Sequence, residues 1–87
     1  MKKLIEVQEV DGEGLMSLLG ELVIIFAHNY FYSGKLMGVN DKDILLENGC
    51  IVYETGPFSD KNWKDAQKVA DKLYIRIDSI ESYAKGK

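Results

Sequence analysis

The sequence predicts a mainly β protein: a small, strongly bent open barrel of five strands, with a short N-terminal helix and a long loop that carries a short helix. Three observations support this fold class. Segments rich in β-branched and aromatic residues recur at close spacing, turn-forming residues separate them, and glycines stand inside the longer segments, where they favour sharp bends. A chain of 87 residues is too short for a second hydrophobic core, so residues 1–87 are expected to form a single domain.

The N-terminal residues are expected to hold an extended segment and then the helix. Within residues 1–10, Ile5 and Val7 alternate with polar neighbours, which favours a short strand or an extended arm. The glycines and acids of residues 11–14 form a break. The apolar residues within 15–19 suit one or two helical turns.

Two strands are expected next. Residues 22–26 form an unbroken apolar run, too short for a helix and suited to a strand that is covered on both faces. His28 and Asn29 favour a tight turn. Residues 30–39 then form a long strand, and Gly34 inside it indicates a bend or the close approach of another backbone.

A third strand is expected over residues 43–54, after a turn at residues 40–42. Asn48-Gly49 interrupts this strand. The dipeptide is typical of a two-residue hairpin turn, but it also suits a bulge in one long, bent strand. The sequence leaves both possibilities open.

The stretch 55–72 breaks the β pattern and is expected to form a long loop with one or two turns of helix. Gly56-Pro57 ends the preceding strand, and Ser59 can cap a short helix. Apolar residues then recur at helical spacing, namely Trp63, Ala66, Ala70 and Leu73. We expect Trp63 to pack the loop onto its own barrel or onto a neighbouring copy.

The last two strands are expected at residues 73–77 and 80–83. A short corner at Asp78-Ser79 joins them, and residues 84–87 form a polar tail. Short strands with strong bends describe a small barrel. On this pattern alone both an SH3-like and an OB-type barrel fit, although an OB fold usually needs a longer chain.

Charge and composition restrict the function. The 11 basic and 14 acidic residues give a net charge of −3 and a pI of about 5.0, which argues against a general nucleic-acid coat but permits a local basic site. The sequence has no phosphate-binding loop, no Ser/His/Asp set and no Cys/His cluster, so it indicates neither an enzyme nor a cofactor or metal site. A single cysteine, Cys50, with no signal peptide and no long apolar run, favours a cytoplasmic protein that does not enter a membrane.

The segment from residue 23 to residue 46 has a specific order. An apolar run is followed by Gly34-Lys35-Leu36, then by Asn40 and Asp43, and then by three aliphatic residues. This order resembles the first motif of the Sm/LSm/Hfq superfamily, which runs as a hydrophobic strand, Gly-x-Leu, an Asp, a Met-Asn pair and a Leu. Asn40 stands in the place of the Asp, and Asp43 stands in the place of the Asn, one residue early.

Residues 75–80 resemble the second motif of the same superfamily. They are Ile-Arg-Ile-Asp-Ser-Ile, whereas the family has Ile-Arg-Gly, a polar pair and Ile, so Ile77 replaces the Gly. The stretch 55–72 then corresponds to the variable loop between the two motifs, and the resemblance covers residues 14–83. The family fold, an N-terminal helix followed by five strands of a bent open barrel, agrees with the order of elements expected above.

The resemblance implies a homo-oligomeric ring. Sm-like barrels pair their last two strands with neighbouring copies. Physical chemistry agrees, because an open barrel has two edges with unpaired N–H and C=O groups that must be paired or covered. A cyclic head-to-tail assembly satisfies both edges at once. The first partner that we expect is therefore the chain itself.

The resemblance also implies RNA as a partner at the inner rim of the ring. Carried over onto this sequence, the candidate nucleic-acid-binding residues are Asn40, Lys42, Asp43 and Arg76. The two cations could meet phosphate or a base edge, and the Asn40 amide could bind a base edge. Asp43 adds negative charge, and no aromatic residue between Asn40 and Asp43 can stack on a base. The sequence thus supports a ring-forming module that binds RNA or single-stranded nucleic acid through atypical residues, or an oligomeric scaffold of the same fold that contacts proteins without RNA.

Overall fold

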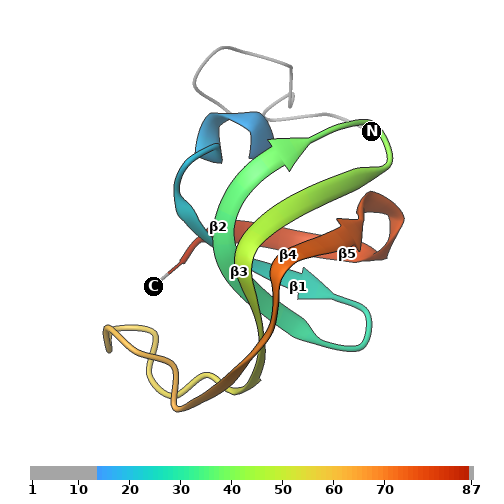
Figure 1. Ribbon diagram of the computed structural model, residues 1–87. Coiled ribbons are helices and arrows are strands. Elements are labelled where there is room, and N and C mark those ends of the chain that lie inside the picture. Colours follow the sequence, from blue (N-terminus) through green and yellow to red (C-terminus); the bar gives the residue numbers. More distant parts are fainter. Residues whose placement is uncertain (1–13, 87) are drawn as a thin grey trace, which may run out of the picture.

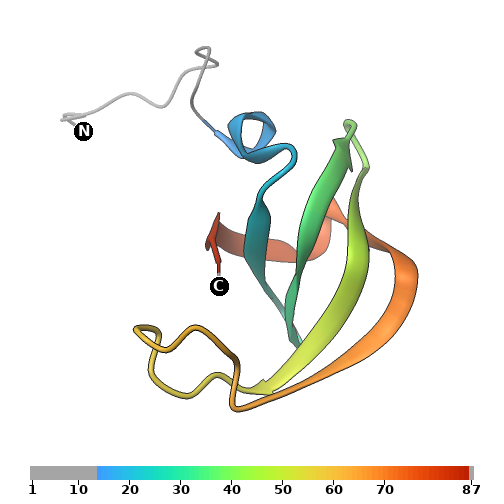
Figure 2. The ribbon, with the colours of Figure 1, turned by 60° about the vertical axis from the view of Figure 1, so that its left-hand side comes forward.

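The computed structural model describes residues 14–86 and shows one antiparallel sheet of five strands (Figure 1). The elements in chain order are the 3-10 turn η1 (Leu15–Leu18), β1 (Leu22–Ala27), β2 (Phe31–Val39), β3 (Asp43–Glu54), β4 (Asp65–Arg76), the 3-10 turn η2 (Ile77–Ser79) and β5 (Ile80–Lys85). The sheet order is β4-β3-β2-β1-β5, and the sheet curls strongly without closing (Figure 2). The predicted mainly β class and the five strands are confirmed. No helix within residues 14–86 is long and apolar enough to cross a membrane.

The centre of the chain follows the prediction closely, and the N-terminal part less so. β1, β2 and β3 begin and end within one residue of the predicted strands. The helix expected at residues 15–19 is only a single 3-10 turn, η1. The strand or arm expected in residues 1–10 lies outside the described residues. The polar tail expected from residue 84 is shorter, because β5 continues to Lys85.

The helix predicted in residues 55–72 is wrong, because β4 begins at Asp65. Val69 is an extra residue in this strand, since its neighbours Lys68 and Ala70 pair with adjacent residues of β3. Such a bulge interrupts the two-residue alternation of a strand. The apolar residues of this segment therefore recur at a spacing that resembles a helix, although the backbone is extended.

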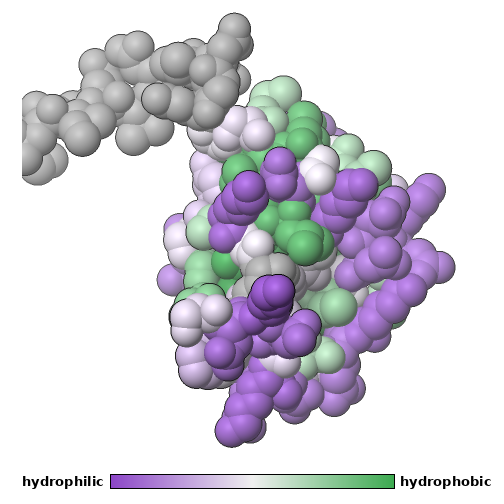
Figure 3. Space-filling model, turned by 90° about the vertical axis from the view of Figure 1, so that its left-hand side faces the viewer, coloured by the Kyte–Doolittle hydropathy of each residue, from purple (hydrophilic) through white to green (hydrophobic). Residues whose placement is uncertain are grey.

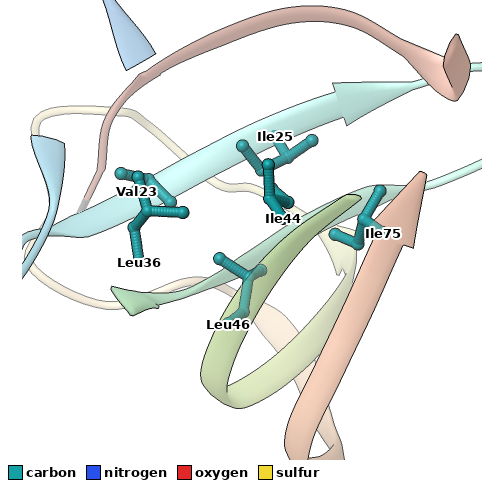
Figure 4. Packing of buried hydrophobic residues seen from close by; sticks show 6 residues of the cluster. All are labelled: Val23, Ile25, Leu36, Ile44, Leu46 and Ile75. Atoms are coloured by element: carbon teal, nitrogen blue, oxygen red, sulfur yellow. The ribbon is translucent and has the colours of Figure 1, made fainter. Parts of the chain in front are cut away.

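The hydrophobic core lies inside the curl of the sheet and takes residues from β1 to β4 (Figure 4). Its buried members are Val23, Ile25, Leu36, Ile44, Leu46 and Ile75. Partly buried apolar residues from η1 and from η2 pack against this cluster. Each fully buried aliphatic side chain stabilises the fold by about 1.5–3 kcal/mol relative to its exposed state. The core therefore packs η1 and η2 against the same sheet.

β1 is covered on its other face too, as the apolar run predicted. Ile24 points away from the core, yet it is only 2% exposed. Its partner in β2, Ser33, is also buried and accepts a hydrogen bond from the indole Nε1–H of Trp63 at 3.1 Å. The β3–β4 loop, residues 55–64, thus carries Trp63 back onto its own sheet, in agreement with one of the two contacts expected for this residue.

The sharp bend of the sheet has an identifiable backbone cause. Asn48-Gly49 does not close a hairpin, because β3 continues through it as a bulge with Asn48 at φ 54°. A Cβ atom at Gly49 would lie 2.5 Å from the Cβ atom of Leu73, and one at Gly34 would lie 3.0 Å from the carbonyl oxygen of Glu47. Glycine at these two positions lets the strands approach closely enough to bend.

β4 and β5 are the edges of the sheet, and each pairs with one neighbouring strand among the described residues. The Gly86 N–H donates to the Leu22 carbonyl, while Ile25 lies opposite Tyr83 and Val23 opposite Lys85. Because N–H groups alternate in direction along an antiparallel strand, Tyr83 and Lys85 direct theirs away from β1. The outer side of β5 therefore presents backbone donors at an open edge.

Candidate nucleic-acid interface

The turn between β2 and β3 is organised by Asn40. Its Oδ1 accepts hydrogen bonds from the backbone N–H groups of Lys42 and Asp43, at 2.8 and 2.7 Å, and its own N–H donates to the Asp43 carbonyl at 2.9 Å. An Asn or Asp side chain often bonds the backbone two or three residues ahead in this way. The side-chain oxygen is thus used by the turn, which leaves the amide N–H groups as the part of Asn40 that could donate to a base.

The second motif lies directly beside this turn. Asp43, the first residue of β3, is opposite Arg76, the last residue of β4, and the Ile77 N–H donates to the Lys42 carbonyl at 2.8 Å. The β2–β3 turn and η2 both appear at the right-hand side of Figure 1. The fold therefore brings all four predicted site residues, which come from two distant segments, to one end of the sheet. The sequence predicted this proximity through the resemblance alone.

Arg76 is an exposed cation of this group. Its guanidinium Nη2 lies 3.3 Å from Asp78 Oδ2, and the two side chains are 78% and 73% exposed. Exposed ion pairs contribute about 0–1 kcal/mol, so this one can exchange for a phosphate at little cost. Three acids, Asp41, Asp43 and Asp78, lie in the same two turns as the cations Lys42 and Arg76. The candidate interface is consequently not strongly basic.

Tyr74 is a further candidate residue for this interface, which the two motifs did not predict. It lies two residues before Arg76 on β4, opposite Leu45 of β3, and its side chain is 64% exposed. Ile75 between them is buried in the core, so Tyr74 and Arg76 share the outer face of the strand. The alternation exposed, buried, exposed over these three residues was the available signal. The structure thus supplies an aromatic ring near the two turns, from β4 and not from the β2–β3 turn.

Comparisons with protein-family models and with curated proteins identify no relative. No family model matches the chain, and no curated protein matches it significantly. The likeness to Sm proteins therefore stays a prediction made from the two motifs. Among residues 14–86, no three His, Cys, Asp or Glu side chains are grouped so that they could hold a metal ion.

Proposed function

We propose that the chain is an Sm-like module that assembles into a homo-oligomeric ring and binds single-stranded RNA at the rim formed by its two motif turns. The observation that supports this best is the meeting of the two motifs at one end of an open sheet, with Asp43 opposite Arg76. RNA is usually recognised in single-stranded form, through stacking on aromatic rings and hydrogen bonds to base edges. The rim offers the ring of Tyr74, the Asn40 amide and two cations for these contacts.

The open edges support the assembly part of the proposal. Exposed strand edges tend to pair with other chains unless they are protected by charge, proline or a covering segment. β5 has no proline, and each edge strand carries an exposed aromatic ring, Tyr74 on β4 and Tyr83 on β5. Pairing the β4 edge of one copy with the β5 edge of the next satisfies both edges, and the assembly closes into a ring if the rotation between copies permits.

The RNA part of the proposal is tested by electrophoretic mobility shifts with oligo-U and oligo-A. Binding is expected at about 50 mM salt and should weaken at higher salt, because phosphate contacts release counterions. Arg76→Ala should weaken binding about five- to tenfold. It should also make the salt dependence of the affinity shallower, by the amount expected for the loss of one phosphate contact. Tyr74→Ala should weaken it by a similar factor or more, since stacking on one aromatic ring is worth about 1–3 kcal/mol per base.

A matched control removes a lysine far from the rim. Lys61 lies in the β3–β4 loop, at the opposite end of β3, so Lys61→Ala changes the net charge by the same amount as Arg76→Ala. RNA binding should be unaffected by this change apart from a small effect of net charge. No mobility shift at about 50 mM salt, where phosphate contacts are strong, would refute RNA binding. If Arg76→Ala dissolves the assembly, Arg76 is instead a structural residue.

The acidic composition of the rim favours a second candidate function, an oligomeric scaffold. Asp41, Asp43 and Asp78 outnumber the two cations of the turns and would repel phosphates. A scaffold of the same fold would form the assembly, bind neither oligonucleotide and contact protein partners instead. The mobility-shift experiment distinguishes the two functions, because both predict the same solution mass and only one predicts a shift.

A further inference from the structure

A hollow lies on the outer face of the sheet, between the β3–β4 loop and the end of β5. We call it the apolar hollow; its volume is about 600 Å³, within the range of small-molecule sites. Its lining residues include Ile24, Phe26, Phe58, Trp63 and Ala84. Lys61, Lys85 and Asp60 stand among these apolar residues. Figure 3 views the molecule from the side of η1 and the β3–β4 loop and shows hydrophobic side chains bordered by hydrophilic ones.

A second hollow adjoins the first within the same loop. We call it the polar hollow; its volume is about 460 Å³, and it shares Asp60, Lys61 and Trp63 with the apolar hollow. Its other lining residues are Gly56, Pro57, Asn62 and Lys64. The two hollows therefore place an apolar, aromatic space beside a polar one that contains two lysines.

The aromatic wall of the apolar hollow, formed by Phe58 and Trp63, is held in place before any ligand binds. Trp63 is fixed by its hydrogen bond to the buried Ser33, and the Phe58 ring meets it edge to face, with centroids 5.9 Å apart and planes at 89°. Phe58 itself is 60% exposed. A wall that is already ordered loses little conformational entropy when a ligand binds, which favours affinity.

The charges around the hollows favour an anion. Lys61, Lys64 and Lys85 line them, against the single acid Asp60, in a chain whose net charge is −3. Lys64 pairs with Glu54 at 3.3 Å and Lys85 with Glu21 at 3.6 Å. All four of these side chains are at least half exposed, so both pairs are weak and can exchange for a ligand.

We propose that the two hollows form one binding site for a planar aromatic ring that bears an anionic group. The ring lies in the apolar hollow against Phe58 and Trp63, and the anion points into the polar hollow toward Lys61 and Lys64. A nucleoside monophosphate and an aromatic carboxylate both have this chemistry. The site is formed by one chain and lies far from the rim, so it depends on neither the ring nor RNA binding.

Trp63 is the only tryptophan of the chain, so its fluorescence reports directly on the site. The probes are AMP and 2-naphthoate, each titrated by Trp63 fluorescence and by calorimetry. At least one of them should bind saturably, and which one binds identifies the source of the ligand. Adenosine, which lacks the anion, and inorganic phosphate, which lacks the ring, should bind at least about tenfold more weakly than AMP if AMP binds. For 2-naphthoate the corresponding controls are naphthalene, which lacks the anion, and acetate, which lacks the ring.

Two variants and one control locate the binding. Phe58→Ala and Lys61→Ala should each weaken binding of the probe about tenfold. Lys72→Ala, on β4 and outside both hollows, removes the same charge as Lys61→Ala and should leave probe binding unchanged. Circular dichroism should show an intact fold in all three, since these side chains are exposed. The proposal is overturned if neither probe binds saturably, if the variants bind like the parent chain, or if Phe58→Ala lowers the solution mass, which would assign the hollows to a contact between copies.

Discussion

At the scale of single residues, the shape of the sheet depends on a few positions where a side chain would not fit. Gly49 lies under Leu73, and Asn48 before it has a positive φ that most side chains disfavour. Gly34 lies against the backbone of the same bulge from the neighbouring strand. These close approaches allow β2, β3 and β4 to bend around the core.

Gly49→Ala is expected to destabilise the fold by about 1–3 kcal/mol, because the new methyl group would overlap Leu73 and force it to move. Gly38→Ala is the matched control, since a Cβ atom there would meet Leu45 at an ordinary 3.7 Å. Urea unfolding at equal protein concentration measures both. If the two variants lose the same stability, the close approach at Gly49 does not govern the bend.

Tyr32 makes stability depend on pH at the alkaline end. Burial, with a smaller effect of the nearby Tyr30, raises the pKa of Tyr32 above its usual value of 10.0. The folded state therefore favours the neutral phenol, and this contribution is complete below pH 10 and is lost as the pH rises through the folded-state pKa. Unfolding free energies measured across this range should fall less steeply for Tyr32→Phe than for the parent chain. Equal pH dependence would contradict the assigned shift.

The candidate site shows what single residues in the sequence can and cannot predict. The fold brings Asn40 and Arg76, which the two motifs singled out, to one end of the sheet. They could not predict that the Asn40 side-chain oxygen closes the turn, because that depends on the local path of the backbone. Tyr74 lies outside both motifs, so the resemblance did not predict it, although strand alternation around the buried Ile75 places it on the same face as Arg76.

At the scale of elements, the strands were predictable and the irregularities were not. β-branched runs and turn residues predicted β1 to β3 almost to the residue. β4 was recognised only in its last part, because the Val69 bulge disturbs the alternation on which strand prediction depends. The bulge at Asn48-Gly49 was one of two possibilities, and the choice depends on contacts with strands far along the chain.

The outer edge of β5 is expected to form the contact between copies. Tyr83→Pro removes a backbone donor that points away from β1, so the pairing within one chain should survive while pairing with a neighbour weakens. Tyr83→Ala is the control, because it removes the side chain and keeps the N–H group. Light scattering should show a loss of assembly in Tyr83→Pro well beyond any loss in Tyr83→Ala. Equal effects of the two changes would indicate a side-chain contact and not edge pairing.

At the scale of the whole molecule, the described sheet is open and its two edges differ in length. β4 has 12 residues and β5 has 6, and each has a single neighbouring strand in residues 14–86. The number of strands follows from local patterns and turns, whereas the sheet order, with β1 beside β5, depends on contacts between distant segments. Local sequence patterns do not predict whether these edges pair with other copies, since that pairing depends on the surfaces of two copies together.

The solution mass, measured by light scattering coupled to size exclusion, tests the central proposal most directly. One chain has a mass of 9.8 kDa. If neighbouring copies pair their sheet edges, one species whose mass is an integer multiple of 9.8 kDa should persist on dilution to micromolar concentration. A stable, folded species of 9.8 kDa at every concentration would contradict the assembly and the ring function built on it.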